Sequence, residues 1–372
     1  MPYSIQDYTK DGLVIFCGAG ISMVEPTCLP SWWELNERVV QALSHQIELF
    51  CGVEQAADLA RQINERRDNQ RFPPEFQAEI ISKYYGSNYF KVLQCLDGKE
   101  PNAVHLAIAT LARSGYVRAI VTSNFDRLLE IAFSKLGVPL KVHFQAEHFD
   151  NLAKQYQQSL SFDSTCQLLK LHGSVDDYHT LVDTLAQRMR GLSPSISDCL
   201  RHLLRNHRWL FMGYSGADLE ANPQYLCLQT EAQHAVGFSW LARESAKTEP
   251  IEAVAKICNL YGERAHIVRG ELPDWFFEEF CPFLPNDLPV PSPMSKEEMA
   301  RRKQQASQAI VNHTREWSKL LGGVGAALII ADILDQSVNN PQAARDLLTQ
   351  ALETQKHDDG TFAALGPPRE YA

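Results

Sequence analysis

The sequence has no excess of positive charge. Its 372 residues include 35 Lys and Arg against 45 Asp and Glu, and the formal net charge at pH 7 is −10. Broad binding of nucleic acid depends on surplus Lys and Arg that neutralise phosphates. The composition therefore argues against direct nucleic-acid binding, although a local basic patch stays open as an alternative.

Paired cysteines are also missing. The nine cysteines are scattered singly, and the chain contains no Cys-x-x-Cys pair. A disulfide framework or a structural zinc site requires closer, paired spacing. His143 and His148 lack an evident third ligand at metal spacing. We therefore expect reduced thiols and no bound metal.

Long apolar runs are absent as well. The two longest, residues 13–24 and 320–331, are shorter than the ~20 residues that a bilayer requires. The N-terminal segment MPYSIQDYTKDG carries charge where a signal peptide has its apolar core. The sequence predicts a cytoplasmic protein that does not bind membranes.

Short apolar segments alternate with helical patterns through most of the chain. Four of these segments are typical of strands buried on both faces of a parallel sheet: 13–17, 117–121, 167–171 and 209–212. Later strand candidates are 236–242 and 265–268, and amphipathic helices are predicted between residues 32 and 85. The pattern predicts an α/β fold: a Rossmann-like parallel sheet with helices on both faces, a helical insertion and an α-helical C-terminal segment.

A proline-rich segment, residues 282–295, predicts a linker after a first domain of residues 1–281. Residues 296–372 are predicted to be helical, with two helices over 320–334 and 343–352. One helix pair buries its own apolar face poorly, and helical repeats need about three or more units. We therefore expect the start of a repeat array and a chain cut from a longer protein.

Polar or glycine-rich clusters follow the first four strands. They are Gly18-Ala19-Gly20-Ile21-Ser22, Thr122-Ser123-Asn124-Phe125-Asp126, His172-Gly173-Ser174 and Gly213-Tyr214-Ser215-Gly216-Ala217-Asp218. In an open α/β sheet, ligands bind beyond the carboxyl ends of the strands. Because all four clusters are expected at that edge, they predict one ligand site.

Each cluster taken singly also has a structural interpretation. The 18–22 segment suits a phosphate but lacks the third glycine of a dinucleotide fingerprint, and the chain has no P-loop. Asp126 and Asp218 could cap the segments that follow them, and His172 could be a satisfied histidine in a turn. Capping leaves the Thr-Ser-Asn run at 122–124 unexplained.

Taken together and in this order, the clusters resemble the motifs of the sirtuin family. The matching segments are GAGIS at 18–22, PNAVHLAIATL at 101–111, VTSNFD at 121–126, KLHGS at 170–174 and GYSGAD at 213–218. They are similar, in turn, to the glycine motif, the helix and the Thr-x-Asn-x-Asp segment, the catalytic-histidine motif and the Gly-Thr-Ser loop. The resemblance covers roughly residues 10 to 270.

The departures from that family narrow the resemblance. The zinc ribbon of protein-deacylating sirtuins and their Phe-Arg pair are absent; LPSWWEL at 29–35 stands in place of the pair, and Phe125 replaces the usual isoleucine. With the Gly-Tyr-Ser-x-x-Asp loop, these features look like the bacterial sirtuin-like NAD hydrolases of anti-phage defence. Several of those carry tetratricopeptide-like C-terminal repeats, which residues 296–372 would begin.

The resemblance implies cleavage of the nicotinamide–ribose bond of NAD, which passes through an oxocarbenium-like transition state. It implies that Asn124 binds the ribose and positions water, that His172 is the general base, and that Asp126 accepts the carboxamide N–H₂. The other implied NAD-binding residues are Gly18, Ala19, Gly20 and Ser22 at the pyrophosphate, Ser215 and Asp218 at the adenosine side, and Thr122 and Gly213.

Two further functions stay open: an NAD-dependent protein deacylase or ADP-ribosyltransferase, and a non-catalytic NAD or ADP-ribose sensor. The missing zinc ribbon argues against the first, and the presence of both Asn124 and His172 argues against the second. An always-active NAD hydrolase would be toxic to its host, so a gate is expected. By analogy we expect a homo-oligomer assembled through helical regions and a phage-derived protein as trigger.

Overall fold

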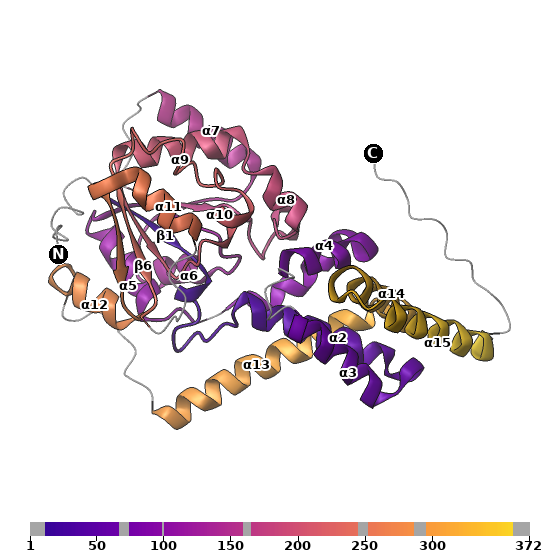
Figure 1. Cartoon of the computed structure of the whole chain (residues 1–372). Helices are drawn as coiled ribbons and strands as arrows, with labels where there is room; N and C mark the ends of the chain where they lie inside the picture. Colours follow the sequence, from indigo (N-terminus) through magenta and orange to yellow (C-terminus); the bar gives the residue numbers. More distant parts are fainter. Residues whose placement is uncertain are drawn as a thin grey trace. The chain divides into compact units, whose positions relative to one another are not determined.

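A computed structural model describes residues 12–66, 74–98, 100–158, 165–244, 252–285 and 295–359 (Figure 1). The chain divides into two compact units. Met1–Glu34 and Ser87–Ile310 form the first, called here the sheet unit. Leu35–Gly86 and Val311–Ala372 form the second, called the helical unit.

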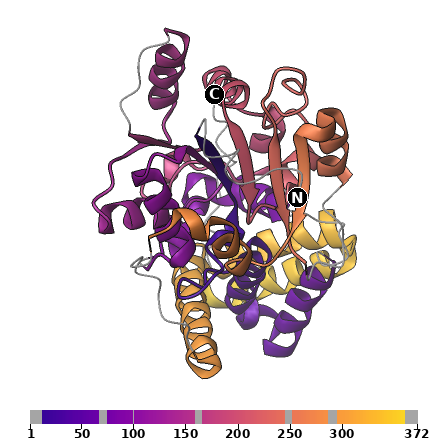
Figure 2. The ribbon, with the colours of Figure 1, turned by 90° about the vertical axis from the view of Figure 1, so that its left-hand side faces the viewer.

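The sheet unit contains a seven-stranded sheet in which every strand pair is parallel (Figure 2). The strand order is β3-β4-β2-β1-β5-β6-β7. The strands are β1 (Leu13–Cys17), β2 (Val117–Thr122), β3 (Leu140–His143), β4 (Cys166–Lys170), β5 (Arg208–Met212), β6 (Phe238–Ala242) and β7 (Ala265–Arg269). The predicted α/β class and parallel sheet are confirmed.

Helices cover both faces of this sheet because successive side chains of a strand point to opposite faces. Val14 and Phe16 of β1 enter one core, with α7 (Ala146–Gln157), α9 (Pro194–Asn206) and α11 (Glu252–Tyr261). Leu13, Ile15 and Cys17 enter the other core, with α5 (Ala103–Arg113), α6 (Leu128–Lys135) and α12 (Asp274–Phe280). A strand buried on both faces must be apolar throughout, as β1 is.

The helical unit contains α3 (Val53–Arg66), α4 (Pro74–Tyr85), α14 (Gly322–Ile333), the π-helical turn η7 (Leu334–Val338) and α15 (Pro341–Asp359), with most of α2 (Trp32–Cys51) and the end of α13 (Lys296–Lys319). Within it α4 packs against α14, and α3 packs against η7. An ion pair between Lys83 Nζ and Asp332 Oδ2, 3.0 Å apart, links α4 to α14.

This grouping differs from the linear division predicted from the sequence, because residues 35–86 share a compact unit with residues 311–372. The reason is burial: Ile329, Ile330 and Ile333 of α14 are fully buried, which needs more apolar surface than one helix pair supplies. Most of the predicted linker, residues 286–294, and the segment after residue 359 lie outside the described residues. The linker and the repeat array therefore stay predictions.

No single helix in the described ranges is long and apolar enough to cross a membrane. The helices Lys296–Lys319 and Gly322–Val338 meet that test only as a pair, and the chain bends by 106° between them.

Candidate functional site

The register of the sheet brings the predicted site residues to one edge. Cys17, the last residue of β1, pairs with Thr122 of β2 and with Met212 of β5. Thr122 in turn pairs with Lys170 of β4. Four neighbouring strands thus end at the same level, and each is followed by one of the four clusters. The prediction that the clusters share one edge is confirmed.

The glycines of two clusters allow the loops after β1 and β5 to pack backbone against backbone. A Cβ atom on Gly18 would lie 2.4 Å from the carbonyl oxygen of Gly213, and one on Gly20 would lie 2.6 Å from the Gly213 Cα. Gly213 itself has a φ of +64°, in the region that favours glycine. These glycines have a packing role that their sequence pattern does not distinguish from phosphate binding.

Most N–H groups of the 18–22 loop bind protein oxygens. Gly18 N–H donates to the Met212 carbonyl (3.0 Å), Gly20 N–H to the Gly213 carbonyl (2.8 Å) and Ser22 N–H to the Ala19 carbonyl (3.0 Å). Ala19 is exposed, and its N–H has no acceptor among the described residues. Within this loop, the N–H group of Ala19 is therefore the backbone donor that is available to a pyrophosphate.

Thr122 fixes the main chain that carries Asn124. The Thr122 hydroxyl donates to the Cys17 carbonyl (2.8 Å) and accepts from the Asn124 N–H (3.0 Å). Thr122 is almost fully buried. The Thr122 hydroxyl thus donates one hydrogen bond and accepts another within the protein. We infer that Thr122 positions the loop that carries Asn124.

The Asn124 side chain is oriented by two acceptors. Its Nδ2 donates to the Gly18 carbonyl (3.2 Å) and to Ser22 Oγ (3.3 Å). Because both partners accept hydrogen bonds, they fix the NH₂ end of the amide. Oδ1 accepts no hydrogen bond from the described residues, so it is available to a ligand hydroxyl or a water molecule.

Asp126 is buried next to Ser22. Its Oδ2 accepts from the Ser22 hydroxyl (2.9 Å), and its Oδ1 accepts from the N–H of Leu128, the first residue of α6 (3.0 Å). Burial raises the pKa of Asp126 to about 6, against the opposing effect of these hydrogen bonds and of Lys170. The capping interpretation therefore accounts for Oδ1, which binds the first N–H group of α6. It does not account for Oδ2, which lies beside Ser22 in the candidate site.

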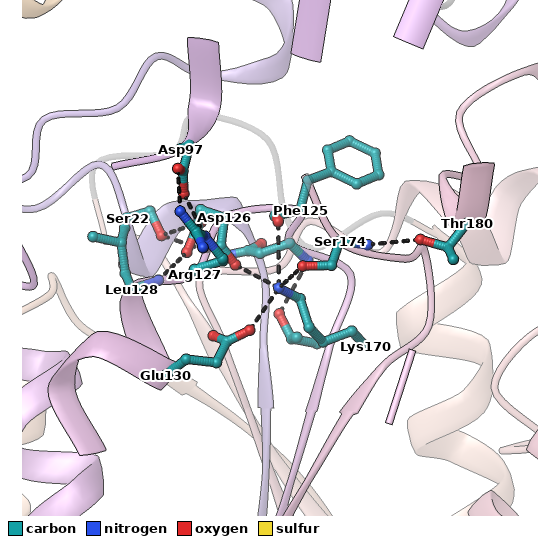
Figure 3. Close-up of polar contacts among 12 residues, drawn as sticks. Ser22, Asp97, Phe125, Asp126, Arg127, Leu128, Glu130, Lys170, Ser174 and Thr180 are labelled. Atoms are coloured by element: carbon teal, nitrogen blue, oxygen red, sulfur yellow. Dashed lines mark hydrogen bonds and ion pairs between the residues drawn. The ribbon is translucent and has the colours of Figure 1, made fainter. Parts of the chain in front are cut away.

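Lys170 links the loop of Asn124 to the loop of His172, and the sequence pattern does not single it out (Figure 3). Its Nζ donates to the Asp126 carbonyl, Glu130 Oε1 and Ser174 Oγ, each at 2.8 Å, and to the Phe125 carbonyl at 3.3 Å. A buried ammonium group is costly unless it is paired and hydrogen-bonded. The sequence signals of Lys170 are its place at the end of an apolar strand, CQLLK, and at the start of the segment KLHGS.

His172 lies beside Asp218, and its imidazole is 1% exposed. Its Nε2 is 3.9 Å from Asp218 Oδ1 and has no hydrogen-bond partner among the described residues. The rings of Phe125 and Tyr225 flank it, with centroids at 6.2 and 5.8 Å. Burial lowers the pKa of His172 to about 4; Asp218 opposes this shift and Arg188 adds to it. At neutral pH the imidazole is therefore uncharged, as a general base must be.

Asp218 is engaged within the protein, and the adenosine-side role predicted for it stays a prediction. It forms a buried ion pair with Arg188 of α8 (Leu185–Arg190) and accepts from the Tyr214 hydroxyl (2.7 Å). Burial opposes its ionisation, but the Arg188 charge holds the pKa of Asp218 below its usual value. Ser215, by contrast, is exposed, so it is the better placed of the two predicted adenosine-side residues to meet a ligand.

Three polar groups of this edge are free to meet a polar ligand: Ala19 N–H, Asn124 Oδ1 and the buried Tyr225 hydroxyl. None has a hydrogen-bond partner among the described residues. Ribose hydroxyls both donate and accept, and a pyrophosphate accepts from N–H groups. The chemistry of these groups therefore fits a nucleotide that carries ribose and pyrophosphate.

Comparison with known families agrees with this chemistry. Residues 118–256 match the family model of a SIR2-like domain. The matched SIR2-like domain contains Asn124, His172 and Asp218, and it suggests NAD-dependent activity. A search of curated proteins found no match to the sequence.

Metal ligands do not cluster in the described ranges, where no group of three His, Cys, Asp or Glu side chains could hold an ion. The Nε2 atom of His143 instead lies 2.8 Å from the Oε1 atom of Gln167. Independence of a metal stays a prediction.

Proposed function

We propose that this chain is an NAD hydrolase that cleaves the nicotinamide–ribose bond and releases nicotinamide and ADP-ribose. The observation that carries the proposal is the fixed amide of Asn124 in the same buried edge as a neutral His172. Phe125, which follows Asn124 in the chain, contacts the imidazole directly. The SIR2-like match over residues 118–256 supports NAD as the substrate.

Each residue has a distinct part in this proposal. Asn124 Oδ1 holds a ribose hydroxyl or the attacking water, and His172 takes up the proton that the reaction releases. Asp126, mainly ionised above a pKa of about 6, accepts from the carboxamide N–H₂. The exposed Ala19 N–H donates to the pyrophosphate, close to the start of a short helical turn, Ala19–Ile21.

Enclosure of the site favours water over a protein as the acceptor. Asn124 is 8% exposed and His172 1%. A deacylase must bring the side chain of an acylated lysine to these residues, whereas hydrolysis needs only a water molecule beside the bound nucleotide. A non-catalytic sensor would need neither a neutral imidazole nor an oriented amide.

We extend the proposal to the biological role that the sequence resemblance implies: NAD depletion in anti-phage defence, in the cytoplasm, under control of a phage-derived protein. Assembly of copies through the helical unit is part of it. Leu49, Val53 and Leu320 of this unit are each more than 60% exposed, so these apolar side chains are available for contact with a second copy.

Product analysis tests the proposed reaction. Purified protein is incubated with NAD, alone and with an acylated peptide, and the products are identified by mass spectrometry. Hydrolysis predicts nicotinamide and ADP-ribose in equal amounts without peptide. A product that carries the acyl group would identify a deacylase, and NAD that is bound but unchanged would identify a sensor.

A further inference from the structure

We propose that Asp218 and Arg188 are positioning residues for His172: Asp218 orients the imidazole and stabilises its protonated form, and Arg188 limits how strongly it does so. This inference rests on the proposed function, because it assigns the groups that support the general base. Neither residue is proposed to touch the substrate.

The geometry identifies Asp218 as the partner of the imidazole. His172 Nε2 has no hydrogen bond among the described residues and lies 3.9 Å from Asp218 Oδ1. A movement of about 1 Å would bring the pair to hydrogen-bond distance. When Nε2 carries the hydrogen that faces Asp218, Nδ1 is left as the nitrogen that can accept a proton.

Arg188 is shared between two buried carboxylates. Besides its ion pair with Asp218, its Nη2 lies 3.7 Å from Asp183 Oδ1. Asp183 is fully buried, and its Oδ2 accepts from the Tyr89 hydroxyl at 2.6 Å. The chain of contacts thus runs from Tyr89 through Asp183, Arg188 and Asp218 to His172.

The charges of this chain are complementary to a protonated imidazole. Although burial opposes its ionisation, Asp218 is negatively charged at neutral pH because Arg188 holds its pKa below the usual value, and its carboxylate lies 3.9 Å from His172 Nε2. Tyr214 and Tyr225 are the other titratable groups that face it in the described residues, and burial raises the pKa of both hydroxyls far above neutrality. A preorganised charge of this kind stabilises the state in which the base has taken its proton.

Local structure fixes both charged residues. Thr184 and Gln187 form a capping box at the start of α8, which sets the backbone on which Arg188 lies. Gly216, with φ of +89°, starts α10 (Ala217–Ala221) and places Asp218 in its first turn.

The test compares buried and exposed residues on the same two helices. Asp218→Asn is paired with Glu220→Gln on α10, and Arg188→Met is paired with Arg190→Met on α8; Glu220 and Arg190 are exposed. Arg188→Lys keeps the charge. Two readouts are recorded: kcat and KM against pH, and the NMR titration of the His172 side chain, whose resonance is assigned by its loss in His172→Gln.

We expect Asp218→Asn to lower kcat by about 10²-fold with little change in KM, the range that general-base catalysis contributes. It should lower the titration midpoint of His172, and Arg188→Met should raise it by about one pH unit, a tenfold change in proton affinity. Arg188→Lys should return the midpoint toward the parental value. The exposed controls should change neither readout.

An unchanged His172 midpoint in both Asp218→Asn and Arg188→Met would overturn the inference. If Asp218→Asn does not fold, the Arg188→Met and Arg188→Lys pair decides it by the same criterion. The NMR titration does not require turnover. Failure of the parent protein to cleave NAD would therefore refute the proposed function and leave the positioning pair to be judged on its own readout.

Discussion

The sheet unit and the helical unit bury different kinds of side chain. At the edge of the sheet, Asn124, Lys170, His172 and Asp218 are all buried, although each costs free energy to remove from water. In the helical unit, α14 buries apolar side chains such as Ile330, and the ion pair that links α4 to α14 includes a lysine that is 61% exposed. Among the described residues, the buried charged side chains lie in the sheet unit, and perturbed ionisation of such groups is typical of functional sites.

The largest effect is expected from the site residues themselves. Asn124→Ala and His172→Ala should each lower NAD cleavage by about 10²–10⁴-fold, because they remove the water-positioning acceptor and the general base. Initial rates of nicotinamide release measure this. Ser123→Ala is the matched control, since Ser123 lies in the same loop and has no assigned role. Near-parental turnover in either site variant would refute the assignment.

Breaking the polar network should cost stability. Lys170→Met leaves Glu130 and two main-chain carbonyl groups without their ammonium partner, so we expect a loss of about 3–5 kcal/mol in the free energy of unfolding. Denaturant unfolding measures it, with Lys141→Met on β3 as an exposed control. A loss no larger than that of the control would show that the network contributes little.

Apolar truncation gives the matching test in the helical unit. Ile330→Ala removes a fully buried side chain from α14 and should destabilise the unit by about 2–5 kcal/mol. Leu320→Ala, at a site 66% exposed, should change stability by no more than about 0.5 kcal/mol. Circular dichroism in denaturant separates the two variants. Equal stability of both would contradict the core described for this unit.

The smallest effect concerns pH. Burial lowers the pKa of His172 to about 4, so between pH 6.5 and 4 the unfolded chain binds more protons there than the native protein. This contribution to stability is complete above pH 6.5 and is lost as pH falls toward 4. Asp126, with its pKa raised to about 6, acts in the opposite sense between pH 3.8 and 6.

His172→Gln isolates the histidine, because Asp126 remains in both proteins. Between pH 6.5 and 5, unfolding free energies should fall by about 2 kcal/mol more in the parent than in His172→Gln. Parallel pH profiles would show that the imidazole is not held neutral by burial.

Local patterns were sufficient to predict the strands that carry the site. The apolar run 13–17 and the polar residues after it are adjacent in the sequence, as are 117–122 and Asn124. The edge strand β3, with the sequence LKVH and only partial burial, has no comparable signal. Neither do α7 and α11, which the sequence pattern also leaves unassigned.

Contacts between distant segments could not be predicted. The pairing of Arg188 with Asp218, the four partners of Lys170 and the packing of α4 against α14 each depend on tertiary structure. The glycines at 18 and 20 show the same limit, because their pattern suits a phosphate loop while their main contacts are with Gly213. The positions of the polar clusters in the sequence were sufficient to predict the edge of the sheet at which the site lies. Which polar atoms at that edge lack a hydrogen-bond partner depends on the packing.

The most direct test of the central claim is the number of turnovers on NAD without any acyl donor. The parent protein, at a concentration far below that of NAD, should release several molecules of nicotinamide per chain, matched by an equal amount of ADP-ribose. Asn124→Ala should release nicotinamide at least about 10²-fold more slowly. NAD that stays intact in the presence of the parent protein, or nicotinamide released only with an acylated peptide, would contradict the account.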